Sequence, residues 1–282
     1  MFKIPLRRSL ISGLVVFAFV ALSVITSANH SWNGYHWARQ ANPFTVKLGD
    51  NVSSAWDSVL ATTSSDWTQS SVLNTTIVAG GASPKSCRPT NGRVEVCNAS
   101  YGNTGWLGVA QIWITGSVHI TQGTVKLNDY YFNQAQYNTT AWRNLVSCQE
   151  VGHTLGLDHQ DTNFNNANLN TCMDYTNNPD SNQHPNQHDY DELVTIYSHL
   201  DSTTTVQSVG RDLANDMPPA MNDIDLRGPG QWGKKIQQSD DGRFMLFELD
   251  FGNGNKVFTF VTWANPEDVN REPIERNPRL IQ

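Results

Sequence analysis

Residues 148–159, near the middle of the chain, have the residue types and spacing of a metal site. Glu150 and His153 lie three residues apart, so on a helix they share one face. Gly156 can end that helix, because glycine adopts the left-handed conformation that a sharp turn needs. The turn would bring His159 back toward His153, so that two imidazoles bind one metal ion. Glu150 would stand beside the ion without binding it, placed to take a proton from metal-bound water.

This pattern resembles the metzincin signature H-E-x-x-H-x-x-G-x-x-H of zinc endopeptidases, with matrixin-like and pappalysin-like groups as the nearest forms. Glu150, His153, Gly156 and His159 match four of its five fixed positions, and Gln149 stands where the family has its first histidine. The resemblance implies Zn²⁺ as the cofactor, His153 and His159 as ligands, and Glu150 as the general base.

Gln149 is the departure from the signature. Its amide is neutral, as an imidazole is, and its oxygen could reach a metal from the helical turn before His153. An amide oxygen is a poorer zinc ligand than imidazole, so the affinity should fall. Three outcomes stay open: Gln149 is a ligand, His184 or His188 replaces it, or the metal binds too weakly for catalysis. We favour the first outcome and expect His184 and His188 to be structural.

A second motif follows the first. Residues 171–175 (Thr-Cys-Met-Asp-Tyr) resemble the methionine turn that lies beneath the metal in metzincins. The resemblance implies that Met173 is a packing floor and not a ligand. It also implies that Tyr175 contacts the metal or stabilises the tetrahedral intermediate. A helix over 188–200 should come next, so the resemblance spans roughly residues 40–200 in element order.

Four cysteines allow three pairings, and an exported protein can oxidise them. We expect the two local pairings. Cys87–Cys97 would clip a hairpin, and Cys148–Cys172 would tie the active-site helix to the methionine turn. A bonded Cys148 would be neither a nucleophile nor a metal ligand.

Residues 1–28 have the pattern of a secretory signal peptide. Lys3, Arg7 and Arg8 give a positive start, the segment 10–25 is nearly all apolar, and small residues follow it. An uncleaved membrane anchor is the alternative, but the apolar run is short for a span. We therefore expect cleavage and a secreted, extracellular protein with no membrane contact afterwards.

The composition limits the possible partners. The chain of 282 residues is long enough for one medium domain and a small extra module. Its formal net charge is −7 and only 16% of its residues are charged, which argues against nucleic acid as a partner. We expect a monomer that acts on a protein or peptide.

The order of the expected elements predicts an α/β domain with a mixed sheet for residues 29–200. The resemblance implies a metzincin-like catalytic domain there, with a mixed, mostly parallel twisted sheet, an active-site helix and a C-terminal helix. Residues 29–42 would form an arm lying on this domain. Strands are expected over 44–48, 72–78, 106–115 and 117–127, and helices over 53–67 and 141–155. In the family a strand facing the cleft binds the substrate backbone, which implies that 106–115 or 117–127 is a substrate edge.

The composition changes after Leu200. Residues 201–230 hold Ser, Thr, Pro, Gly and Asp without a period, which indicates a linker or strap. Residues 231–282 are expected to form a small antiparallel β appendage and a loose tail, with a hairpin turn at 252–255.

The leading interpretation is a secreted zinc endopeptidase. The main alternative is a catalytically weak or inactive pseudoprotease, disabled at Gln149 and acting as a secreted binding module. In a third interpretation, residues 231–264 bind a surface or a glycan and carry the catalytic domain as cargo.

Overall fold

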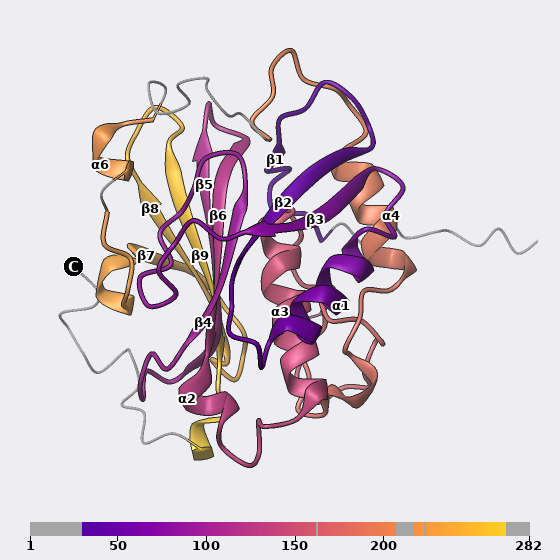
Figure 1. Cartoon of the computed structure of the whole chain (residues 1–282), viewed down its shortest axis with the longest axis vertical. Helices are drawn as coiled ribbons and strands as arrows, with labels where there is room; N and C mark the ends of the chain where they lie inside the picture. Colours follow the sequence, from indigo (N-terminus) through magenta and orange to yellow (C-terminus); the bar gives the residue numbers. More distant parts are fainter. Residues whose placement is uncertain (1–29, 162, 207–216, 223, 269–282) are drawn as a thin grey trace, which may run out of the picture.

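The computed structural model describes residues 30–161, 163–206, 217–222 and 224–268, which form a mixed α/β protein (Figure 1). The expected signal peptide at 1–28 and residues 269–282 of the expected loose tail (265–282) lie outside the described residues. No helix within the described ranges has the length and apolar character needed to cross a membrane.

The first half of the sheet is parallel. Its strands in the centre are buried on both faces, as is usual where other elements cover both sides of a sheet. The order is β3-β2-β4-β6, and a short strand, β1, pairs with the start of β6. These strands are β1 (His36–Trp37), β2 (Phe44–Asn51), β3 (Leu73–Ala79), β4 (Val94–Ala99) and β6 (His119–Asn128).

The second half of the sheet is antiparallel. It continues from β6 through β5 (Trp106–Thr115), β9 (Lys256–Trp263), β8 (Phe244–Asp250) and β7 (Lys234–Gln238). The expected hairpin is present between β8 and β9. The prediction of a separate small β appendage is wrong, because β9 pairs with β5 and so extends the main sheet. Four strand pairings are parallel and four are antiparallel, so the sheet is mixed without being mostly parallel.

The antiparallel half changes the expectation for substrate binding. Strand β5 lies between β6 and β9, and β6 lies between β4 and β5. Neither strand therefore offers an open edge to a peptide, and the expectation that 106–115 or 117–127 is a substrate edge is wrong for this structure.

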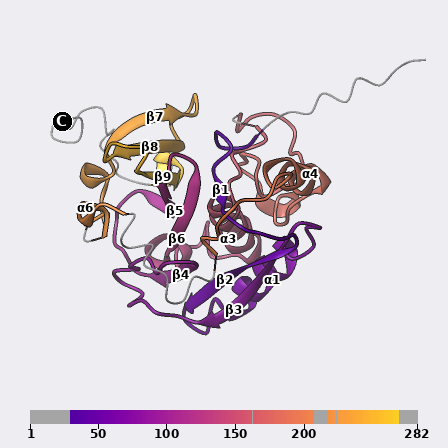
Figure 2. The same cartoon turned by 90° about the horizontal axis from the view of Figure 1, so that it is seen from above.

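Three longer helices lie on one side of the sheet, which curves round the central one (Figure 2). Helix α3 packs against β5 and β6, and α1 packs between α3 and β3. The main core fills this space and includes Trp37 and Trp67, both fully buried. The helices are α1 (Asp57–Trp67), α3 (Thr140–Thr154) and α4 (Gln187–Ile196), with the short α2 (Asp129–Phe132) after β6 and the 3-10 turns η1 (Pro179–Ser181) and η3 (Pro266–Asp268).

A second core lies on the opposite face of β5, β8 and β9. Its cover includes α6 (Pro219–Asn222) and the 3-10 turn η2 (Pro229–Gln231). Trp113 donates its indole N–H to the carbonyl of Met221 at 3.3 Å, and Trp232 donates to that of Leu226 at 2.9 Å. Residues 217–222 and 224–230 of the expected linker are thus a strap packed on the sheet, whereas residues 201–206 bond to Ala38 and Arg39 of the N-terminal arm.

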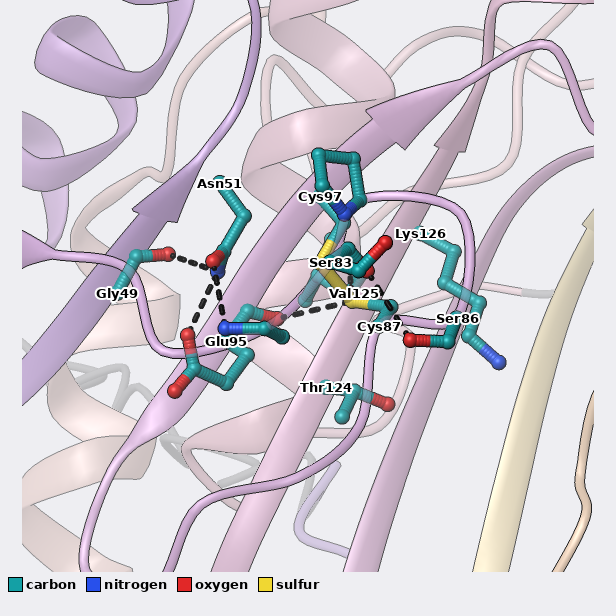
Figure 3. The surroundings of a disulfide bond; sticks show 12 residues. Gly49, Asn51, Ser83, Ser86, Cys87, Glu95, Cys97, Thr124, Val125 and Lys126 are labelled. Carbon is teal, nitrogen blue, oxygen red and sulfur yellow. Dashed lines mark hydrogen bonds between the residues drawn. A yellow bond between two sulfur atoms is a disulfide. The ribbon is translucent and has the colours of Figure 1, made fainter.

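Both expected disulfides are present, Cys87–Cys97 and Cys148–Cys172. The first does not clip a hairpin, because only Cys97 lies in a strand and Cys87 follows a turn. Beside this disulfide, the Asn51 amide donates to the buried Glu95 carboxylate at 2.6 Å (Figure 3). The Cys87–Cys97 disulfide therefore fastens the loop before β4 to that strand.

Candidate active site

Helix α3 begins and ends with specific caps. The Thr139 hydroxyl accepts the Trp142 N–H at the start, which is the usual role of threonine at this position. At the end, Leu157 N–H donates to the Gly152 carbonyl at 3.3 Å and Gly156 N–H to that of His153 at 3.2 Å, the two bonds of a Schellman motif. Gly156 has φ +100°, so the predicted bend at this glycine is confirmed.

The bend at Gly156 also needs glycine for space. A Cβ there would lie 2.4 Å from the carbonyl oxygen of Tyr35, in the N-terminal arm. The arm is held against the turn, because Trp32 N–H donates to the Gly156 carbonyl at 2.9 Å. The expected arm over 29–42 therefore lies on the domain and supports the turn.

His153 and His159 meet as the sequence predicts. Their ring centroids lie 4.5 Å apart, and both side chains are buried. His153 Nδ1 lies 2.9 Å from the Leu157 carbonyl, which assigns the proton to Nδ1 and the lone pair to Nε2. His159 Nδ1 lies 3.4 Å from a carboxylate oxygen of Asp158. Within the described residues neither Nε2 has a hydrogen-bond partner.

Burial keeps both rings neutral. It lowers the pKa of His153 to about 3, and the nearby His159 adds to this effect. Burial also lowers the pKa of His159, although Asp158 opposes it. Neutral imidazole is the form that binds a metal, so both rings are in the state that a metal site requires.

Glu150 lies between α3 and strand β5. A Cβ on Gly108 of that strand would come within 2.6 Å of a Glu150 carboxylate oxygen, so the glycine makes room for the acid. Burial raises the pKa of Glu150 to about 8, because the charged carboxylate loses its contact with water. Neither oxygen of the carboxylate makes a well-formed hydrogen bond to any described residue.

Gln149 is bonded at both ends of its amide. Its Nε2 donates to the Cys172 carbonyl at 3.0 Å, and its Oε1 accepts the Thr262 hydroxyl at 2.9 Å. Because Thr262 has one hydroxyl proton, that proton is not available to Glu150. The Gln149 oxygen keeps a second lone pair, and its role as a ligand stays a prediction.

The other two candidate histidines lie in separate contacts. His184 Nδ1 is 2.7 Å from a carboxylate oxygen of Asp66, and His188 stacks on His30 at 4.8 Å between ring centroids. Over the described ranges, no third His, Cys, Asp or Glu completes a cluster with His153 and His159 in which all ligand atoms lie within 4.8 Å. Neither histidine therefore replaces Gln149 in this structure.

The methionine turn lies beneath the helix. A Cβ on Gly152 would be 2.6 Å from Met173 Sδ, so the sulfur packs directly under α3, as expected of a packing floor. Tyr175 lies with its ring centroid 4.2 Å from that of His159, and its buried hydroxyl has no partner within the described part of the chain. Burial raises the pKa of Tyr175 well above 10, so the hydroxyl stays protonated.

Two phenylalanines cover the imidazoles, and sequence reasoning missed both. Phe260 of β9 stacks on His153, with centroids 4.3 Å apart and an interplanar angle of 10°. Phe244 of β8 meets His159 edge to face at 4.4 Å. Both lie in strands with continuous runs of buried residues, so nothing in their local pattern distinguishes them from other core residues.

The site thus gathers His153, His159 and Tyr175 in a closed, apolar space, with Glu150 buried on α3 one helical turn before His153. This set can bind a divalent metal, hold a proton and donate a hydrogen bond. It is closed by the chain's own C-terminal strands. No protein-family model matches this chain and no curated protein matches it, so the assignment depends on these residues.

Proposed function

We propose that this chain is a secreted zinc-dependent endopeptidase of the metzincin type, in a closed state. One observation carries the proposal. Four polar side chains (Glu150, His153, His159 and Tyr175) bury polar atoms that have no hydrogen-bond partner among the described residues. Each such group costs about 1–3 kcal/mol when left unpaired. Four of them together in one place point to an occupant that they bind.

The donor set fits zinc. His153 and His159 offer neutral imidazole nitrogens, which suit this ion, and Gln149 offers an amide oxygen as a third donor. Asp158 beside His159 and the Leu157 carbonyl beside His153 orient the two rings through their other nitrogens. A zinc ion bound there would supply a Lewis acid that polarises the peptide carbonyl and acidifies water.

The remaining residues would move and hold protons. Glu150 takes the proton from the attacking water and returns it to the leaving amine nitrogen. A pKa of about 8, raised by burial, suits a group that both accepts and returns a proton near neutral pH. The protonated Tyr175 hydroxyl can donate a hydrogen bond to the carbonyl oxygen as negative charge develops on it.

Access requires a change in the C-terminal strands. Phe244 and Phe260 lie against the imidazoles, and β9 occupies the edge of β5. A peptide can reach Glu150 only after the β8–β9 hairpin moves from α3. The proposed enzyme is therefore slow in this closed state.

The test uses purified protein without its signal segment and measures zinc content together with hydrolysis of an unstructured peptide. We expect about one zinc per chain at this site, hydrolysis that stops on chelation, and loss of hydrolysis in Glu150→Gln. Glu267→Gln is the matched control, because Glu267 is exposed and far from the described site contacts. Equal hydrolysis by Glu150→Gln and wild type would refute the mechanism.

A second function has one specific observation in its favour. Both polar ends of the Gln149 amide are satisfied within the chain, and a fully bonded amide needs no metal. In this interpretation the chain is an inactive pseudoprotease that serves as an exported binding module. A His153–His159 pair that takes up no zinc at physiological concentrations would favour it.

A further inference from the structure

A second group of histidines lies away from the candidate active site. His36 comes from β1, His119 from the start of β6, and His199 and Asp201 from the chain after α4. The ladder between β1 and β6 places His36 directly beside His119. Nothing in the local sequence links these segments, because they are separated by about 80 residues each.

The ligand atoms of this group converge. His36 Nε2 lies 3.4 Å and His119 Nε2 3.2 Å from the same oxygen of Asp201, Oδ1. His199 Nε2 lies 3.1 Å from His36 Nε2 and 3.7 Å from Asp201 Oδ1. Ligands about 2.0–2.2 Å from a tetrahedral zinc ion are about 3.3 Å apart, which matches the distances from Asp201 Oδ1 to His36 and to His119. The ligand atoms of His36, His119 and Asp201 all lie within 4.8 Å of one another, and His199 lies outside this set.

The hydrogen bonds around the group leave lone pairs facing inward. His36 Nδ1 is 2.7 Å from the Gly34 carbonyl, which places its proton there and its lone pair on Nε2. Asp201 Oδ2 accepts the Arg39 backbone N–H at 3.1 Å and its guanidinium at 2.8 Å, so Oδ1 is the free oxygen. Two acceptors, His36 Nε2 and Asp201 Oδ1, thus face each other at 3.4 Å.

A bound cation stabilises this pair of facing acceptors better than added protons do. Arg39 already neutralises Asp201, and a proton on His36 Nε2 would place a further positive charge on that buried ring. One divalent ion binds His36, His119 and Asp201 with neutral rings. Imidazole-rich sets select zinc over magnesium or calcium, which prefer oxygen.

We propose that His36, His119 and Asp201 form a second zinc site, which joins three segments of the chain. Three protein ligands leave one position of a tetrahedral ion to a water molecule. The ion would join the N-terminal arm, the turn between β5 and β6, and the chain after α4. The same arm supports the turn at Gly156, so this site would stabilise the part of the fold that holds His159.

The test titrates Zn²⁺ or Co²⁺ into chelator-treated protein and compares three substitutions. His119→Asn removes one ligand of this site, His153→Asn removes the pair at the candidate active site, and His184→Asn is the control. We expect His119→Asn to weaken binding of one metal equivalent by more than about a hundredfold. Substitution of a residue that only supports a ligand typically costs about 10–100-fold in metal affinity. We expect His153→Asn and His184→Asn to keep that equivalent and the visible absorption of tetrahedral Co²⁺.

Two results would overturn the proposal. One is a wild-type protein that binds no metal equivalent sensitive to His119→Asn. The other is unchanged tetrahedral Co²⁺ absorption in that variant. If His119→Asn does not fold, Asp201→Asn replaces it, because it removes a charged ligand with almost no change in side-chain volume. In addition, nitrogen NMR of the wild-type histidines must show Zn²⁺-dependent shifts at His36 and His119, and their absence would also end the proposal.

Discussion

The Thr262 hydroxyl donates a hydrogen bond to the side-chain oxygen of Gln149 at 2.9 Å, and so joins strand β9 to helix α3. The residue that departs from the metzincin signature is therefore tied to the segment that closes the site. A histidine at this position has no carbonyl oxygen to accept that hydroxyl in the same way. The Gln149 side chain that replaces the first histidine of the signature thus also helps to hold β9 over the site.

The first prediction concerns Gln149→His. We expect the substitution to raise zinc affinity at the candidate active site by at least about tenfold, because imidazole is the better ligand. It should also raise peptide hydrolysis, because the bond to Thr262 is lost. Zinc titration and a peptide assay measure the two effects. Gln136→His, at an exposed position, is the control, and a variant that binds zinc no more tightly than wild type would contradict the prediction.

The second prediction concerns Phe244, which covers the His159 ring. Phe244→Ala and Phe247→Ala each remove a buried ring from β8, at a cost of about 3–5 kcal/mol. Only Phe244 faces the imidazoles, since Phe247 lies in the core on the opposite face of the sheet. At a temperature where both variants are folded, we expect Phe244→Ala to hydrolyse an unstructured peptide several-fold faster than wild type. We expect Phe247→Ala to hydrolyse it at the wild-type rate. Equal rates in the two variants would show that Phe244 does not block access.

The third prediction is a pH profile of the metal-free protein. Burial raises the pKa of Glu150 to about 8, so its contribution to stability is complete below the unfolded value near 4.5 and is lost as the pH rises toward 8. Burial lowers the pKa of His153 to about 3, so its contribution is complete above 6.5 and is lost as the pH falls. The free energy of unfolding should therefore be highest where the two ranges overlap, between about pH 4.5 and pH 6.5, because the two opposite slopes cancel there.

Glu150→Gln tests the alkaline side of that profile. We expect the variant to lose less stability than wild type between pH 5 and pH 8, by up to about 1.4 kcal/mol for each pH unit. Chemical denaturation with a chelator present measures the difference. Glu267→Gln should follow the wild-type profile, and parallel profiles for Glu150→Gln and wild type would mean that Glu150 is not buried as the acid.

The sequence predicts those parts of the site that depend on nearby residues. The bend at Gly156 follows from one glycine, and the meeting of His153 with His159 follows from the bend. The cover by Phe260 could not be predicted in this way. It depends on β9 pairing with β5, which are about 150 residues apart, and pairings of that kind leave no local pattern.

The histidine group at His36 shows the same limit. Its members are single residues in three segments, each with the composition of an ordinary strand end or loop. Only the parallel pairing of β1 with β6 and the return of the chain after α4 bring them together. No spacing rule applies across such distances, so the sequence predicts one metal site and not two.

The fourth prediction concerns the glycine on which the turn depends. Gly156→Ala would force a Cβ to within 2.4 Å of the Tyr35 carbonyl, in addition to the strain of φ +100°. Gly102→Ala is a matched control, because Gly102 has φ +87° and no heavy atom within 4 Å of the position that the added methyl group would take. We expect the control to lose about 1 kcal/mol from strain alone and Gly156→Ala to lose more. Because the clash displaces the turn that carries His159, zinc affinity should fall only in Gly156→Ala. Denaturation and zinc titration of both variants measure this, and equal losses in the two would mean that the arm does not fix the turn.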